Sequence, residues 1–421
     1  MKVLVIGGGG RECALCWKLS QSNNIEKIYA VPGNAGISKI AQCVELDYES
    51  NFSHLDRLVK KEKIDFSIAG PEVPLVNGIV DYFQKKGHSI FGPSKRAALL
   101  EGSKVFAKRF MKKYGIPTAD FKVFSDPDKA MEYIKKKGCP RVIKADGLAA
   151  GKGSLIATNE KEAKEALNLI MVKKAFGKAG EKAVIEEKLK GEEISFLVLT
   201  DGESIKSLVS SQDYKRIYEG DRGPNTGGMG AYSPAPLSSS LYKKIIKEII
   251  IPTLKGMKKE KREYRGVLYA GLMIERGQPK VLEFNARFGD PETQVILPRL
   301  KTDLLNLLLA VSRRKLNKII LEWRSQAAVC VILASKGYPK SYEKGKKIEG
   351  LENIARLKNI FPFYAGVKRE NGNIVTSGGR VIGITALSKN LKEAIRDSYR
   401  AINKIHFEGM YYRKDIGYKK E

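Results

Sequence analysis

Histidine and cysteine are both scarce in this chain of 421 residues. Its three histidines, His54, His88 and His406, all lie outside the glycine-rich segments. There is no HExxH motif and no Cys/His set at zinc spacing, so the sequence offers no zinc site. No Ser/His/Asp arrangement can be argued either. The five cysteines form an odd, sparse set, which argues against a disulfide scaffold.

Long apolar runs are also missing. No segment is long enough to span a bilayer, and the opening MKVLVIGGGG is too short and too rich in glycine for a signal peptide. We therefore expect a cytoplasmic protein with no membrane partner. With 43% hydrophobic residues, a chain of this length can bury a large core and exceeds one ordinary domain.

Acidic residues are outnumbered, with 47 Asp and Glu against 76 Lys and Arg, which gives a formal net charge of +29. Such a charge would suit a nucleic-acid partner. However, the basic runs at 60–63, 135–137 and 258–263 fall on separate predicted helices, without the interleaved aromatic residues of a single-strand stacking surface. We predict no specific nucleic-acid partner, and we expect the positive field to attract small anionic substrates.

Residues 1–101 alternate short apolar runs with helical patterns, which predicts a doubly wound parallel sheet. The strands are expected at 2–6, 27–31, 65–70 and 89–92, and the helices between them at about 11–22, 53–62 and 75–86. Each strand opens into a Gly/Pro loop. Because the carboxyl ends of parallel strands share one edge of a sheet, these loops are expected to meet there and to bind ligands.

The rest of the chain predicts two further α+β units. A small lobe at about 120–192 precedes two hairpins, the first turning at Asp201-Gly202. A leucine-rich helix is expected over 293–313. We therefore expect a multidomain α/β protein with three domains, at 1–101, 102–325 and 326–421.

The first glycine-rich segment is GGGGRE, at residues 7–12. It does not satisfy the dinucleotide fingerprint, because Glu12 stands where the third glycine is needed, and the acidic residue for a ribose is missing after the second strand. A strand, glycine turn and helix still present free N–H groups that suit a phosphate, and Arg11 can add charge. On the same helix, Cys16 is predicted to be a small core residue. The role of Cys13 stays open: it lies near Arg11 and the helix N-terminus, where the pKa of a thiol can be lowered and the thiol made reactive.

The second segment is VIKADGLAAGKG, at residues 142–153. It is not a P-loop, which needs a Lys-Ser/Thr pair opening a helix. A glycine loop between two strands can close over nucleotide phosphates as a lid. Lys144 and Lys152 can then neutralise charge while a phosphoryl group moves.

Two acidic strand ends complete the set. In 184–196, a strand end offers backbone groups to an adenine edge, and Glu192 or Glu193 can accept ribose hydroxyls. In 281–293, Glu283 and Asn285 alternate on one strand face and offer the hard oxygen ligands that Mg²⁺ prefers.

Taken in order, these segments resemble the phosphoribosylamine–glycine ligase family (glycinamide ribonucleotide synthetases) of the ATP-grasp superfamily. The resemblance runs over essentially the whole chain, through GGGGRE, PGNAG, GPE, FGPS, LEGSK, VIKADGLAAGKG, SQDYKR, GPNTGGMGAYSPAP and LEFNARFGDPETQ. It implies a pre-ATP-grasp domain, a two-lobed ATP-grasp domain with a mobile small lobe, and a small C-terminal domain. It also implies that ATP, with Mg²⁺ or Mn²⁺, drives the ligation of glycine to 5-phosphoribosylamine through glycyl phosphate in purine synthesis, by a monomer.

The resemblance also implies roles for individual residues. For ATP it implies Lys104, Lys144, Gly147, Gly151, Lys152, Gly153, Glu186, Glu187, Leu189 and Glu193. For the metal it implies Glu283 and Asn285. For glycine and phosphoribosylamine it implies Gly9, Gly10, Arg11, Glu12, Gly33, Asn34, Asp213, Asn225, Gly227, Gly228, Met229, Arg287 and Asp290. The catalytic residues among these are expected to be Lys144, Asp213 and Arg287.

The chain departs from the family pattern at two positions. Cys13 and Tyr214 stand where the family commonly has histidine, and both are expected near the phosphoribosylamine site. A thiol cannot replace a protonatable imidazole, so substrate affinity or pH dependence is expected to differ. The alternatives are another ATP-grasp carboxylate–amine ligase, differing at 213–216 and 223–236, or a basic nucleic-acid-binding protein.

Overall fold

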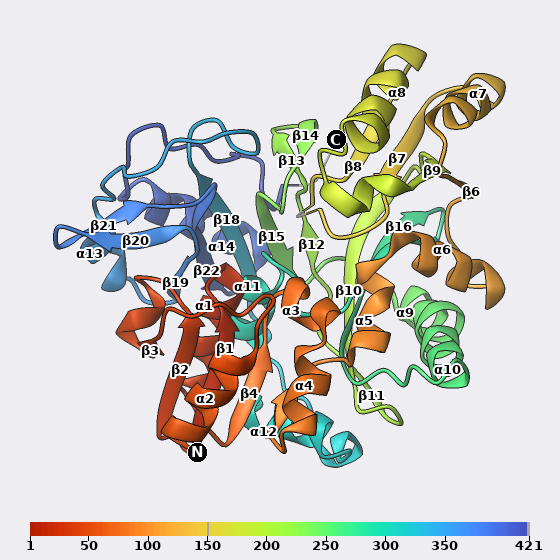
Figure 1. The fold of residues 1–421 in the computed structure, drawn as a ribbon. Coiled ribbons are helices and arrows are strands. Elements are labelled where there is room, and N and C mark those ends of the chain that lie inside the picture. Colours follow the sequence, from red (N-terminus) through yellow and green to blue (C-terminus); the bar gives the residue numbers. More distant parts are fainter. Residues whose placement is uncertain (150, 419–421) are drawn as a thin grey trace.

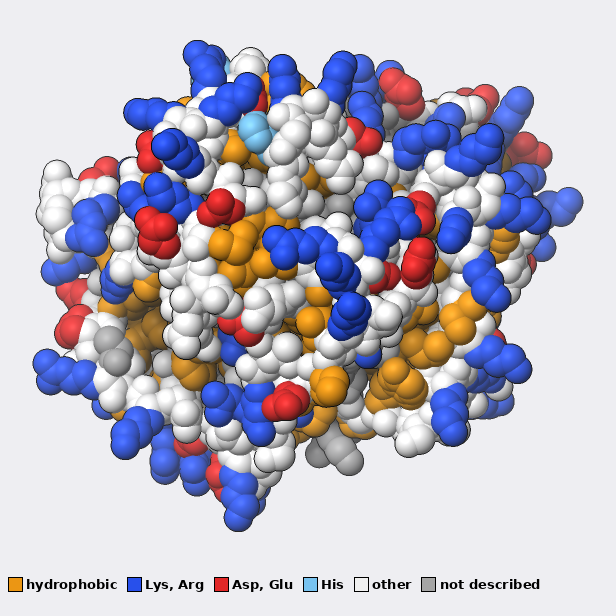
Figure 2. All heavy atoms as spheres, turned by 90° about the horizontal axis from the view of Figure 1, so that it is seen from below, with side chains coloured by type: hydrophobic (Ala, Val, Ile, Leu, Met, Phe, Trp, Pro, Cys, Tyr) orange, Lys and Arg blue, Asp and Glu red, His pale blue; other side chains and the backbone are white. Residues whose placement is uncertain are grey.

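The computed structural model describes residues 1–149 and 151–418, apart from the side chain of residue 355. Figure 1 shows the amino-terminal segment at the lower left, the carboxy-terminal segment above it, and the segment between them to the right. No described helix is long and apolar enough to cross a membrane. On the face seen in Figure 2, lysine and arginine side chains are spread widely and interleaved with acidic ones.

The amino-terminal segment is a five-stranded parallel sheet in the order β3-β2-β1-β4-β5, as the alternating pattern predicted. Its strands are β1 (Lys2–Gly7), β2 (Lys27–Pro32), β3 (Gln42–Cys43), β4 (Phe66–Ala69) and β5 (Ile90–Phe91). Its helices are α1 (Gly10–Leu19), α2 (Ser53–Glu62), α3 (Glu72–Asn77) and α4 (Ile79–Lys85). The single helix expected at 75–86 is two helices, because Gly78 takes a left-handed conformation (φ 95°) between them.

The small lobe is an antiparallel sheet in the order β6-β9-β7-β8, with two helices on it. Its elements are β6 (Phe121–Phe124), α7 (Pro127–Lys137), β7 (Arg141–Ala145), β8 (Ser154–Ala157), α8 (Glu160–Leu167) and β9 (Ala183–Glu187). Asp126 and Asn159 cap the two helices by accepting backbone N–H groups. The lobe has an apolar cluster of its own, which includes Ile134, Ile143 and Ile185.

The large lobe is a second antiparallel sheet, in the order β11-β10-β16-β17, flanked by helices. Its strands are β10 (Glu192–Thr200), β11 (Ile205–Ser207), β16 (Gly266–Glu275) and β17 (Gln278–Asn285). Its helices are α5 (Lys95–Gly102), α6 (Lys104–Lys113), α9 (Ser239–Ile245) and α10 (Ile251–Lys259). Figure 1 shows this lobe between the small lobe and the amino-terminal sheet.

The third antiparallel sheet, in the order β12-β15-β18-β22-β19, combines the carboxy-terminal segment with two earlier strands. Its strands are β12 (Gln212–Asp213), β15 (Gly230–Ser233), β18 (Ala327–Ala334), β19 (Ile360–Tyr364) and β22 (Arg380–Ser388). The helix α14 (Leu391–Ile402) packs on β18 and β22. The chain also forms two small antiparallel ribbons. One pairs β13 (Arg216–Tyr218) with β14 (Arg222–Asn225), and the other pairs β20 (Val367–Glu370) with β21 (Asn373–Thr376). A short helix, α13 (Leu351–Ala355), precedes β19.

The leucine-rich helix expected over 293–313 is broken in two, so that prediction was wrong. α11 (Thr293–Ile296) ends in a tight turn that contains Pro298, and α12 (Leu304–Ser312) begins afresh. The Asp303 carboxylate caps α12 by accepting the Asn306 N–H at 2.8 Å. Leucine residues before and after the break keep the apolar pattern continuous, so the pattern alone predicted one helix.

Two apolar clusters join the segments. Val3 and Val5 of β1 belong to one cluster, with Leu304 of α12 and Val329 of β18. Leu4 and Ile6 point the other way, because strand side chains alternate, and they belong to a second cluster with large-lobe residues such as Phe196. Trp17 of α1 lies against Phe361 of β19, with ring centroids 4.8 Å apart.

Candidate active site

A cavity of about 830 Å³ lies where the two lobes, the glycine turn after β1 and the start of β22 meet. The sequence-predicted residues that line it are Gly9, Arg11, Glu12, Lys104, Lys144, Gly151, Gly153, Glu186, Glu187, Leu189, Glu193, Asp213, Asn225, Gly227, Glu283, Asn285, Arg287 and Asp290. The fold therefore brings together residues that are nearly 300 positions apart in the chain.

Two lysines mark one end of the cavity. Lys104 Nζ donates to Gly147 O at 2.9 Å, so it reaches the glycine loop between β7 and β8. Lys144 Nζ donates to Leu282 O at 3.0 Å and is ion-paired with Glu186. The other Glu186 oxygen is paired with Lys108, which also donates to Thr118 Oγ1 at 2.8 Å. Burial lowers the pKa of Lys104.

Glu283 of β17 lies beside a further lysine. Lys215 Nζ is 3.1 Å from Glu193 Oε2 and 3.8 Å from Glu283 Oε1. Burial opposes the charge on Glu283, but Lys215 and the neighbouring cations outweigh it and lower the pKa of this carboxyl to about 2. Glu283 is therefore an anion at neutral pH, as a metal ligand must be.

Arg287 lies two residues beyond the end of β17 and is held from several directions. Its Nε donates to Glu72 Oε2 at 3.1 Å, and its Nη2 lies 3.0 Å from Glu101 Oε1 and 3.4 Å from Asn285 Oδ1. Burial opposes ionisation of Glu72, but the Arg287 and Arg11 guanidiniums lower the pKa of that carboxyl to about 2. This network fixes the planar Arg287 fork at the edge of the cavity.

The opposite end is formed by the glycine turn. Gly9 N donates to Glu12 Oε2 at 2.7 Å, and Arg11 Nε donates to Glu12 Oε1 at 2.6 Å. Arg11 Nη1 donates to Phe288 O at 3.3 Å, which links α1 to the 287–292 segment. The Glu12 carboxylate thus orients the glycine turn that was predicted to bind a phosphate.

The half-buried Asp213 and the buried Glu292 are two carboxyls on the cavity wall. Burial raises the pKa of Asp213 to about 8, and Glu292, Glu193 and Glu283 add to this effect while Lys215 opposes it. Glu292 Oε1 accepts the Tyr269 hydroxyl at 2.5 Å and the Ser195 hydroxyl at 3.0 Å. The wall therefore contains one carboxyl fixed by hydroxyls and another that favours its protonated form at neutral pH.

Some predicted residues do not contribute to the cavity wall, and Lys152 among them is exposed. Among the described residues, those expected at the site that do not line the cavity are Gly10, Gly33, Asn34, Gly147, Lys152, Gly228 and Met229. Met229 is fully buried. Asn34 Nδ2 donates to Gly8 O at 2.8 Å and to Tyr364 O at 2.9 Å, so it shapes the glycine turn from behind.

The two residues that depart from the family pattern are both buried. Cys13 is 4% exposed, and burial raises the pKa of its thiol to about 12, so the lowering that a helix N-terminus can cause does not occur here. The Tyr214 hydroxyl donates to Tyr418 O at 3.0 Å and accepts the Gly417 N–H at 3.1 Å. Neither residue lines the cavity, so the expected change in substrate affinity has no contact to support it.

Sequence reasoning missed several residues on the cavity wall: Glu72, Glu101, Lys108, Lys215, Glu292 and Arg380. Some local signals were available. Lys108 is four residues after Lys104 and so shares its face of α6, and Lys215 stands within SQDYKR. Arg380 had no local signal, because its partners are about 90 and 150 residues away.

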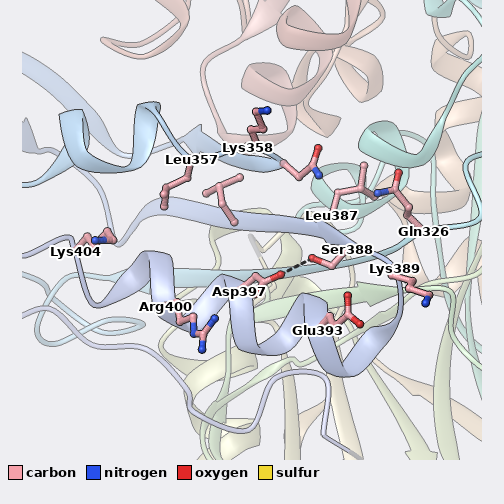
Figure 3. Close-up of a pocket in the computed structure, with 12 residues that line it drawn as sticks. Gln326, Leu357, Lys358, Leu387, Ser388, Lys389, Glu393, Asp397, Arg400 and Lys404 are labelled. Atoms are coloured by element: carbon pink, nitrogen blue, oxygen red, sulfur yellow. Dashed lines mark hydrogen bonds between the residues drawn. The ribbon is translucent and has the colours of Figure 1, made fainter.

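A second cavity, of about 420 Å³, lies in the carboxy-terminal segment between α14 and the ends of β19 and β22 (Figure 3). Its wall includes Arg400 on α14, Lys404 just beyond the end of that helix, and Lys358 opposite them. Asp397 accepts the Ser388 hydroxyl at 2.8 Å. It shares no lining residue with the central cavity and contains none of the predicted site residues.

The fold and the central cavity define an ATP-grasp enzyme, an ATP-dependent ligase whose glycine loop and lysines lie between two α+β lobes. The sequence was compared with families of known proteins. The ATP-grasp (A) domain of phosphoribosylglycinamide synthetase matches residues 102–293, its N domain matches 1–101, and its C domain matches 328–419. The chain therefore belongs to the phosphoribosylglycinamide synthetase family.

Individual relatives agree with this assignment. The phosphoribosylamine–glycine ligase of Caldanaerobacter subterraneus is 53% identical over 417 residues, which cover 99% of each chain. That of Halalkalibacterium halodurans is 50% identical over 100% of this chain and 97% of its own. The crystal structure of phosphoribosylamine–glycine ligase from Thermotoga maritima superposes with a TM-score of 0.84 at 38% identity, covering 99% of this chain and 100% of that one.

Proposed function

We propose that this protein joins glycine to 5-phosphoribosylamine, with ATP as the phosphoryl donor and glycyl phosphate as the intermediate. Relatives of about 50% identity over their full length carry this activity in their names. The observation that carries the proposal is one cavity lined by Lys104 and Lys144, by the oxygen ligands Glu283 and Asn285, and by the glycine turn after β1. These three parts suit a nucleotide, a divalent cation and a sugar phosphate.

ATP is proposed to lie between the lobes. Lys104 and Lys144 would contact its phosphates, and the 147–153 loop would cover them and exclude water. Adenine would lie against Glu186, Glu187 and Leu189, and Glu193 would accept the ribose hydroxyls. Lys215 is paired with Glu193, so this lysine would also lie beside the bound nucleotide.

Glu283 and Asn285 are the proposed ligands of Mg²⁺ or Mn²⁺. The donor set fits, because an ionised carboxylate and an amide oxygen alternate on one strand face and both line the cavity. No cluster of three or more His, Cys, Asp or Glu side chains suited to a metal occurs among the described residues, so a cation here would complete its shell with water and phosphate oxygens. When bound, the cation neutralises charge on the transferring phosphates.

The chemistry begins with a glycine carboxylate, whose charge and resonance make it a poor electrophile. Transfer of the γ-phosphoryl group to a carboxylate oxygen releases ADP and gives glycyl phosphate. The amine of phosphoribosylamine then attacks the carbonyl carbon, loses a proton and expels phosphate, leaving the amide. Arg287 and Lys144 would stabilise the moving phosphoryl group, and Asp213 and Asp290 would orient the glycine and amine side.

The three segments divide this work in the proposal. Residues 1–101 supply the glycine turn for the sugar phosphate, residues 102–325 bind ATP, with about 120–192 as a moving lobe, and residues 326–421 close the acceptor end. We place the enzyme in the cytoplasm as a monomer.

The test is coupled ADP release with Mg-ATP, omitting glycine and phosphoribosylamine in turn. Continuous ADP release should require both glycine and phosphoribosylamine. Turnover with another acid and no dependence on glycine would identify a different ATP-grasp ligase and refute the proposal.

A variant separates the metal assignment from the overall reaction. Glu283→Gln should lower glycine-dependent turnover by about 100-fold or more, because it removes a charged ligand from the transferring phosphates. It should also weaken Mn²⁺ binding measured by electron paramagnetic resonance in the presence of ATP. Glu275→Gln, at the exposed end of β16, is the matched control and should change neither quantity. Unchanged Mn²⁺ affinity in the Glu283 variant would contradict the assignment.

A further inference from the structure

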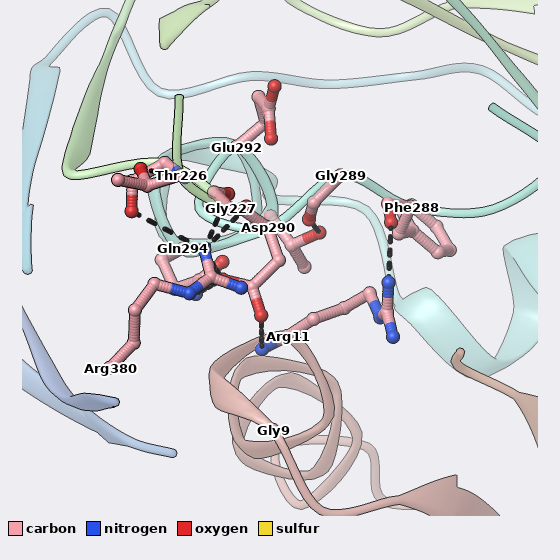
Figure 4. Close-up of polar contacts among 12 residues, drawn as sticks. Gly9, Arg11, Thr226, Gly227, Phe288, Gly289, Asp290, Glu292, Gln294 and Arg380 are labelled. Atoms are coloured by element: carbon pink, nitrogen blue, oxygen red, sulfur yellow. Dashed lines mark hydrogen bonds and ion pairs between the residues drawn. The ribbon is translucent and has the colours of Figure 1, made fainter. Parts of the chain in front are cut away.

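Arg380 is the first residue of β22 in the carboxy-terminal segment, yet its guanidinium lies among loops of another part of the chain (Figure 4). Its Nη1 donates to Gly227 O at 2.7 Å and to Asp290 O at 2.9 Å. The same nitrogen lies 3.3 Å from Asp290 Oδ1. One side chain therefore holds the 225–230 loop and the 288–292 segment together at the wall of the cavity.

Asp290 extends this connection to the glycine turn. Its Oδ1 accepts Gln294 Nε2 at 2.7 Å, and its Oδ2 accepts the Arg11 N–H at 3.4 Å, in the first turn of α1 (Figure 4). Burial opposes the charge on Asp290, but Arg380 and Arg11 outweigh it and lower the pKa of the carboxyl. Both partners are thus charged, and the contact is a charge-assisted pair in a largely buried place.

The loop is built to receive this guanidinium. A Cβ on Gly227 would lie 2.9 Å from Arg380 Cζ, closer than real contacts allow, so the planar group packs directly on the glycine backbone. A guanidinium has five donors in a fixed plane, whereas a lysine ammonium is a compact point charge. The contacts of Arg380 with both segments come from one nitrogen, Nη1, while the rest of the planar group packs on Gly227. A lysine would keep the charge and lose this planar packing.

We propose that Arg380 is a positioning residue for the amine substrate: through Gly227 and Asp290 it sets the acceptor end of the cavity against the glycine turn. The proposal rests on the proposed function, since that function decides which substrate occupies this end. Among residues 1–149 and 151–418, Arg380 forms no hydrogen bond or ion pair with a residue assigned above to ATP, so its removal should act on one substrate selectively. The carboxy-terminal segment thereby supplies part of the reaction site.

The test compares Arg380→Gln and Arg380→Lys with Arg400→Gln, a change of an exposed arginine on α14. Initial rates are measured with phosphoribosylamine, glycine and ATP varied in turn. Both Arg380 variants should raise the KM for phosphoribosylamine at least 10-fold, with the KM for ATP within about twofold of the parent, because loss of charge-assisted hydrogen bonds is localised there. The Arg400 variant should match the parent in all three.

A second variant guards against loss of folding. Gly227→Ala keeps Arg380 but forces the guanidinium off the loop, and it should raise the same KM. An unchanged KM for phosphoribosylamine in Arg380→Gln would overturn the proposal. So would a parallel rise in all three KM values together with a lower unfolding temperature, which is the result of a purely structural role. If the parent enzyme shows no dependence on phosphoribosylamine, the proposed function fails first, independently of Arg380.

Discussion

Lys108 gives the protein a pH dependence of stability that can be worked out in advance. Its side chain and that of Glu186 are each 3% exposed, and Glu186 lies between Lys108 and Lys144. Burial lowers the pKa of Lys108 from 10.5 to about 8, although Glu186 opposes this change. The folded protein therefore binds this proton more weakly than the unfolded chain does.

The sign follows from proton linkage. Between pH 8 and 10.5 the unfolded chain retains a proton that the folded protein has lost, so the free energy of unfolding rises with pH. Each pKa unit corresponds to about 1.4 kcal/mol, so the full difference is about 3 kcal/mol, of which about 2 kcal/mol falls between pH 8 and pH 10. Below pH 8 the whole penalty is present, because the charged ammonium is buried in the folded state.

Lys108→Met removes this proton and keeps a side chain of similar length. The assay is urea unfolding of parent and variant at pH 8 and pH 10, followed by tryptophan fluorescence. The unfolding free energy of the parent minus that of the Lys108→Met variant should rise by about 2 kcal/mol between pH 8 and pH 10. Subtracting one protein from the other cancels the titration of all groups common to both. A difference that stays constant with pH would refute the reasoning.

Two further predictions concern the residues that depart from the family pattern. Cys13 should resist alkylation in the native protein, with or without phosphoribosylamine, whereas the half-buried Cys139 should react. Peptide mapping identifies the labelled cysteine, and rapid labelling of Cys13 in the native protein would contradict its burial. Tyr214→Phe should lower the unfolding free energy by about 1–3 kcal/mol, because Gly417 N and Tyr418 O lose their partner, while every KM stays unchanged. A changed KM for phosphoribosylamine in that variant would place Tyr214 at the substrate after all.

The sequence was informative where the information is local. The alternation of apolar runs with Gly/Pro loops predicted the parallel sheet, because strand, turn and helix signals all lie within a few residues of one another. The alternation of Glu283 and Asn285 placed both on one strand face for the same reason. Pro298 and Asp303 were also readable as stop and start signals, and were outweighed by the leucine pattern.

The remaining features depend on distant partners. Arg287 is held by Glu72, which is 215 residues away, and no local sequence pattern near either residue predicts this contact. Cys13 shows how burial overrides position: the start of a helix favours a thiolate, but Tyr364 and the carboxy-terminal segment cover this helix. A pattern within a window cannot tell which face of a helix another part of the chain will cover.

The two sides of β1 contribute to different apolar clusters, each shared with another segment. Separating residues 1–101 or 326–421 from the rest would thus leave half of a core facing water. Each of these segments thus depends on a neighbouring segment to cover its apolar side chains. The small lobe differs, because Ile134, Ile143 and Ile185 belong to a cluster formed within the lobe itself.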